Sequence, residues 1–108
     1  MTGNFLGKIT FAEYGTVRDY PYLMGLQLEF SMQCGNCGCG KRYTVNISKD
    51  CNWEESDRKV SITASVDKVH DILTDAKVNY VSELKGKPVE VVLENSTFKD
   101  FRILKEVL

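Results

Sequence analysis

The four cysteines of this chain constrain its fold more than any other feature, because three of them are clustered. The segment Cys34-Gly-Asn-Cys37-Gly-Cys39-Gly40 is a Cys-x-x-Cys knuckle with a third cysteine directly after it, and Cys51 follows further along. Two thiolates at this spacing hold one metal ion, and the glycines let the backbone turn tightly around it. Soft sulfur donors select zinc, which prefers four ligands in a tetrahedral arrangement. The pattern therefore predicts a structural zinc site with ligands Cys34, Cys37, Cys39 and Cys51.

Three alternatives to zinc stay open at this point: a Cys34–Cys37 disulfide, a redox-active Cys-x-x-Cys, and a loop of idle thiols. Cys51 also raises a geometric question. If residues 43–48 form a straight strand at about 3.3 Å per residue, Cys51 lies on the order of 20 Å from Cys37. It joins the site only if the chain bends after Tyr43 or if it comes from a second copy. Otherwise it is a small buried thiol beside Trp53.

Composition favours one folded domain spanning residues 1–108, with 43% hydrophobic residues and only two prolines. The formal net charge of −1 argues against direct nucleic-acid binding, which normally needs a basic surface. No run of apolar residues approaches the roughly 20 needed to cross a bilayer, and the first residues lack a secretion signal. These features predict a soluble cytoplasmic protein. In that reducing compartment, clustered cysteines favour metal binding over disulfides.

Alternating apolar residues predict five strands. They are expected at residues 5–14, 26–33, 43–48, 89–94 and 101–104. A connecting loop is expected over residues 15–22, and the cysteine cluster falls at the tip of the hairpin formed by the second and third strands. The short connection Asn95–Lys99 predicts that the last two strands are antiparallel neighbours.

One helix is predicted over residues 56–77, where apolar side chains repeat every three or four positions to form one stripe. The stripe consists of Ile62, Val66, Val69, Leu73 and Ala76. The element order is β-β-β-α-β-β, which predicts an α+β fold: an antiparallel sheet of about five strands with the helix on one face. His70 is expected at the edge of the stripe, half-buried and without a ligand role, and the alternative is that His70 replaces Cys51 as the fourth metal ligand.

Two charged groups are candidate binding surfaces. Asp67, Asp71 and Asp75 recur every four residues and are expected opposite the stripe, where an acidic row suits a basic partner. The alternative is an ordinary solvated helix face. Lys41 and Arg42, beside the cysteines, are a possible phosphate contact or a plain exposed hairpin. No nucleophile, base and orienting group occur in a recognisable motif, so no enzymatic activity is expected.

Two stretches carry a family resemblance: residues 41–53, and the tail from residues 77–84 to residues 94–104. They resemble small proteins carried by phages and prophages of Gram-positive bacteria, over most of the chain from Ile9 onward. The cysteine-bearing form also resembles zinc-containing anti-CRISPR proteins of the type II-A class. The resemblance implies a non-enzymatic protein that binds the host's RNA-guided DNA nuclease and stops it from loading or cutting DNA.

On this interpretation, zinc fixes the hairpin tip, and the row of Asp67, Asp71 and Asp75 meets a basic region of the type II nuclease that normally holds nucleic acid. The alternative function is a zinc-ribbon-like nucleic-acid-binding or replication accessory protein, with Lys41, Arg42, Lys85 and Lys87 as phosphate contacts. A thiol redox protein that uses Cys34 and Cys37 is the third hypothesis.

Overall fold

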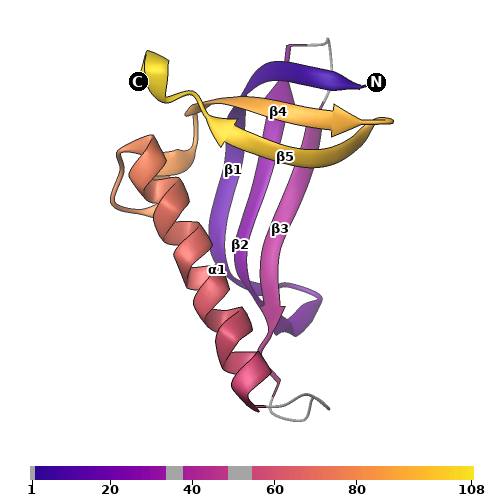
Figure 1. Cartoon of the computed structure of the whole chain (residues 1–108), viewed down its shortest axis with the longest axis vertical. Coiled ribbons are helices and arrows are strands. Elements are labelled where there is room, and N and C mark those ends of the chain that lie inside the picture. The colour runs from indigo at the N-terminus through magenta and orange to yellow at the C-terminus, as the bar shows by residue number, and fades with distance from the viewer. Residues whose placement is uncertain (1, 34–37, 49–54) are drawn as a thin grey trace.

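The chain folds into a strongly curled antiparallel sheet with a long helix lying along it (Figure 1). The computed structural model describes residues 2–33, 38–48 and 55–108. The elements in chain order are β1 (Gly3–Val17), β2 (Tyr20–Met32), β3 (Gly38–Asn46), α1 (Glu55–Ala76), the 3-10 helix η1 (Val81–Leu84), β4 (Pro88–Glu94), β5 (Thr97–Ile103) and the 3-10 helix η2 (Lys105–Val107). The predicted α+β class and element order are confirmed.

The sheet has the spatial order β3-β2-β1-β4-β5, and every neighbouring pair is antiparallel. Residues 3–8 of β1 pair with β4 and residues 7–17 pair with β2, so only Gly7 and Lys8 have a partner on both sides. An irregularity between Ile9 and Phe11 lies where β1 passes from one partner to the other. An extra residue bends a strand and increases its twist. In Figure 1 the β4–β5 hairpin accordingly crosses the long strands β1, β2 and β3 at a steep angle.

The predicted loop over residues 15–22 is wrong. β1 continues to Val17 and β2 begins at Tyr20, so the turn itself is confined to Arg18 and Asp19. Gly15 of β1 is paired with Gly25 of β2. The two strands therefore stay paired beyond Gly15, the residue that suggested a loop. The turn between β4 and β5 is also shorter than predicted. Asn95 and Ser96 both have positive φ angles, as in the two-residue turns that match the twist of a hairpin.

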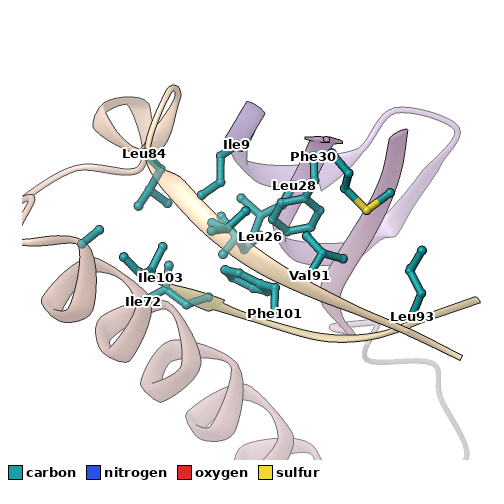
Figure 2. Packing of buried hydrophobic residues seen from close by; sticks show 13 residues of the cluster. Ile9, Leu26, Leu28, Phe30, Ile72, Leu84, Val91, Leu93, Phe101 and Ile103 are labelled. Atoms are coloured by element: carbon teal, nitrogen blue, oxygen red, sulfur yellow. The ribbon is translucent and has the colours of Figure 1, made fainter. Parts of the chain in front are cut away.

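The hydrophobic core fills the concave side of the curled sheet. Side chains of β1, β2, β4 and β5 meet there with the C-terminal half of α1 and with Leu84 of η1 (Figure 2). Three aromatic rings join opposite ends of the sheet: Phe30 of β2 lies 5.7 Å from Phe98 and 4.9 Å from Phe101, measured between ring centroids. The curl therefore brings β5 against β2 although two strands separate them in the sheet.

Helix α1 is confirmed within one residue at each end, but the face it buries differs from the predicted stripe. Ser65, Ile72 and Ala76 are the buried residues of α1, while Val66 is 54% exposed. Val69 and Leu73 are partly buried. The helix packs into the hydrophobic core mainly through its C-terminal half, where Ile72 lies close to Ile103 and Phe101 (Figure 2). The N-terminal half lies along β3 instead, where Nη2 of Arg58 donates to the carbonyl of Ile47 at 3.1 Å.

Candidate functional site

The cysteine site falls largely outside the described residues. Cys34, Cys37 and Cys51 lie outside them, and Cys39 is the one predicted ligand that the structure places. Cys39 is half-buried on β3, paired with Phe30 and in contact with the edge of the core. Burial raises the pKa of its thiol. Because zinc binds the thiolate, coordination by Cys39 would have to displace a firmly held proton.

Strand β3 is straight where a bend would be needed for a four-cysteine site within one chain. It pairs with β2 from Gly38 to Asn46 without a register shift, and the Ile47 amide then donates to the Tyr22 carbonyl at 2.9 Å. Ile47 therefore lies on the order of 25 Å along the strand from Cys39. The bend after Tyr43 does not occur within this strand. Within residues 2–33, 38–48 and 55–108, no group of three or more His, Cys, Asp or Glu side chains is placed to hold a metal ion.

His70 is not half-buried as predicted. Its side chain is 78% exposed, and Nδ1 lies 3.9 Å from the Asp71 carboxylate. It stands at the rim of an apolar groove of ≈ 280 Å³ between α1 and β1, lined by Tyr14, Val66, Val69 and Leu73. The groove exists because α1 buries a face rotated away from Val66. His70 therefore belongs to the solvent-exposed side of the helix.

The acidic row divides into two parts. Asp67 and Asp71 are exposed, whereas Asp75 is partly buried and forms an ion pair with Lys105 at 3.6 Å between Nζ and Oδ1. A step of four residues advances about 40° around a helix. The three carboxylates therefore drift from the outer face at Asp67 to the flank at Asp75. Asp67 has no ion pair among the described residues, and Asp71 has only the exposed His70 beside it.

Lys41 and Arg42 lie on β3 beside a cleft of ≈ 400 Å³ between this strand and α1. On the helix side the cleft is lined by Lys68 and Ser65, which belong to no sequence motif. Their spacing of three residues on a helix was the available signal. Lys85 and Lys87 lie in the turn before β4, on the far side of β1 and β2 from β3, and they do not line this cleft. The structure thus separates the four predicted phosphate contacts into two pairs.

Tyr43 forms the floor that joins the two sides of this cleft. The Nζ atoms of Lys41 and Lys68 lie 5.7 and 5.1 Å from its ring centroid, and Phe101 lies 6.3 Å from it on the core side. Burial and, to a smaller extent, the carboxylate of Asp100 raise the pKa of Tyr43. The ring is therefore neutral and has two ammonium groups near it, an arrangement that favours contact between these cations and the π electrons.

Comparison with protein-family models, with curated proteins and with solved structures gave no match to this chain. No described helix is both long enough and apolar enough to span a membrane.

Proposed function

We propose that this chain is a phage-encoded inhibitor that binds the type II RNA-guided DNA nuclease of a Gram-positive host. The resemblance of residues 41–53 and of the C-terminal tail to phage proteins suggests the biological setting. The observation that carries the proposal is the exposed carboxylate pair Asp67 and Asp71 on α1, one helical turn apart. A nuclease of this class holds an RNA–DNA duplex in a positively charged channel. A rigid negative helix face complements such a surface.

The proposed contact uses Asp67 and Asp71 rather than all three aspartates. Asp75 is already paired with Lys105, so its charge is partly neutralised within the chain. Asp67 and Asp71 are free to meet arginine and lysine side chains of a partner. Exposed pairs at an interface rim contribute little each, but they steer association and exclude partners of the wrong charge. The inhibitor therefore docks through the outer face of α1, with the sheet as its scaffold.

Reversal of two charges tests this docking face. We expect the double variant Asp67→Lys/Asp71→Lys to weaken inhibition by at least about tenfold, because two attractions become two repulsions. The measurement is a cleavage assay with guide-loaded nuclease, titrated with each variant. Glu13→Lys/Asp19→Lys is the matched control, since both residues are exposed on or beside β1 and the change in net charge is identical. Equal inhibition by both double variants would show that Asp67 and Asp71 do not contact the nuclease.

A second candidate function, a nucleic-acid-binding accessory protein, is favoured by one observation: Lys41, Arg42 and Lys68 line one cleft. A gel-shift titration in increasing salt separates the two functions. Tight binding to plain DNA or RNA that falls steeply with salt supports the accessory protein. Binding to the nuclease without such a shift supports the inhibitor.

The cofactor proposed for this protein is one structural zinc ion, with Cys34, Cys37, Cys39 and Cys51 as ligands. When bound, zinc would hold the chain between β2 and β3 in one conformation. Cys39 supplies its ligand from the first residues of β3, close to the Cys34 and Cys37 positions in sequence. Because β3 runs straight to Asn46, a fourth ligand from Cys51 is most simply supplied by a second copy of the chain.

Metal analysis of cysteine variants tests the zinc proposal. We expect elemental mass spectrometry of the purified protein to find zinc, and we expect Cys34→Ser and Cys37→Ser to lose it. Both should also melt at lower temperature, because structural zinc stabilises the folded state by its binding free energy. Loss of zinc in Cys51→Ser, together with a dimer that dissociates on chelation, would show the shared site. Protein without metal, and with free or disulfide-bonded thiols, would exclude zinc.

A further inference from the structure

The cleft between β3 and α1 gathers positive charge without a compensating carboxylate. Its lining includes Lys41, Arg42 and Thr44 of β3 and Ser61, Ser65 and Lys68 of α1, around a volume of ≈ 400 Å³. No aspartate or glutamate lines it in the described part of the chain. Lys41, Arg42 and Lys68 form no ion pair with any described residue. The cleft is therefore a concave basic site in a chain whose formal net charge is −1.

Two of these cations share one aromatic partner. The Nζ atoms of Lys41 and Lys68 both lie within 6 Å of the centroid of the Tyr43 ring. The attraction of the ring for cations positions them, although their like charges repel each other. An anion bound between the two ammonium groups would attract both of them, and these attractions would offset the repulsion between the two positive charges. The geometry is that of a site prepared for negative charge.

Hydroxyl groups supply the neutral donors of the site. Ser65 is 9% exposed, and its Oγ is buried without a hydrogen-bond partner in the described residues. A serine inside a helix usually satisfies its hydroxyl by donating to the carbonyl four residues earlier. Leaving a buried hydroxyl unpaired has a free-energy cost. Ser61, one turn earlier, lines the same wall of the cleft, so an oxyanion there would meet two hydroxyls and two ammonium groups.

We infer that the β3–α1 cleft binds a phosphoryl oxyanion, with Lys41 and Lys68 providing charge and Ser61 and Ser65 providing hydrogen bonds. Phosphate fits better than a carboxylate because it presents more acceptor oxygens, at a wider spread, to donors on two walls. The oxyanion belongs either to a free phosphate ester or to a nucleic-acid backbone. This inference is independent of the proposed nuclease inhibition, which uses Asp67 and Asp71 of α1 rather than the residues that line the cleft.

An NMR titration with inorganic phosphate tests the site directly. At constant ionic strength, phosphate should shift the backbone amide signals of Thr44, Ser61, Ser65 and Lys68 in a saturable way, whereas chloride and acetate should not. Lys41→Gln/Lys68→Gln should weaken phosphate binding by at least about tenfold. Lys59→Gln/Lys85→Gln is the matched control, because both residues are exposed, lie outside the cleft and give the same charge change. Ser65→Ala should also weaken phosphate binding, and chloride should still not shift the signals of this variant.

Short oligonucleotides identify the source of the oxyanion. If an unphosphorylated oligonucleotide shifts the same signals at lower concentration than inorganic phosphate, the ligand is a nucleic-acid backbone. If only inorganic phosphate or a terminal phosphate does so, the ligand is a phosphate monoester. Identical shifts with phosphate and chloride, or equal losses in the cleft variant and its control, would overturn the inference. The inference would also be overturned if both the Ser65→Ala variant and the Lys41→Gln/Lys68→Gln variant bound phosphate as tightly as the unmodified protein.

Discussion

Replacing Phe30 with alanine is expected to lower the free energy of unfolding by about 3–5 kcal/mol. Phe30 is 2% exposed and contacts two rings of β5, with Phe98 stacked on it and Phe101 tilted against it. These contacts hold the curl of the sheet, because they join strands that are not hydrogen-bonded neighbours. Truncation therefore removes buried area, leaves a cavity and loosens β5 from the long strands.

The measurement is thermal or urea unfolding followed by circular dichroism. For a domain of this size the loss corresponds to a fall in Tm of roughly 10–30 °C. Phe11→Ala is the control, since Phe11 lies on β1 with 40% of its surface exposed, and we expect it to cost less than about 1 kcal/mol. Phe30→Leu, which retains a large apolar side chain, should fall between the two. Similar losses for Phe30→Ala and Phe11→Ala would show that the ring cluster does not hold the sheet.

Replacing Gly25 with alanine is expected to destabilise the fold by more than about 2 kcal/mol, through backbone strain and steric overlap. Gly25 has a φ angle of +156° and is paired with Thr44 of β3. A Cβ atom at this position would overlap the carbonyl oxygen of Tyr43 and lie 2.8 Å from the Cα of Thr44. Both atoms belong to the backbone, so relief requires β2 and β3 to separate. Urea unfolding of the variant measures the loss.

Gly15 offers a matched control for this substitution. It is the partner of Gly25 across β1 and β2, and a Cβ atom added there meets nothing within 4 Å. Gly15→Ala should be neutral, or should stabilise by up to about 1 kcal/mol, because alanine has less conformational freedom to lose on folding. If the two alanine variants had equal stability, the close approach of β2 and β3 at Gly25 would be wrong.

The strands and the helix were predictable because their local patterns are strong. Leu26, Leu28 and Phe30 alternate with polar residues along β2, and all three are buried. The turn at Arg18 and Asp19 was missed because Gly15 and Pro21 are typical of loops. In the structure, Gly15 lies within a paired strand and Pro21 lies beyond the residues that pair with β3. Pairing between strands, which no local pattern records, overrides these single-residue signals.

It was harder to predict which residues lie together on the candidate surfaces than to predict the helix and strands that carry these residues. Val66 belongs to the apolar stripe by spacing, yet it is exposed, because the helix turns the face of Ser65, Ile72 and Ala76 toward the sheet. Asp75 belongs to the acidic row by spacing, yet Lys105 from beyond β5 neutralises it. The basic cleft joins Lys41 to Lys68 across two elements far apart in sequence. Such juxtapositions depend on how the sheet curls, which the sequence pattern does not specify.

The most direct test of the proposed function is cleavage of a matched DNA by a purified, guide-loaded type II nuclease in the presence of increasing amounts of this protein. We expect cleavage to stop at amounts of protein comparable to the nuclease, and we expect the two proteins to co-elute in size-exclusion chromatography. Undiminished cleavage at a large molar excess, with separate elution of the two proteins, would contradict it.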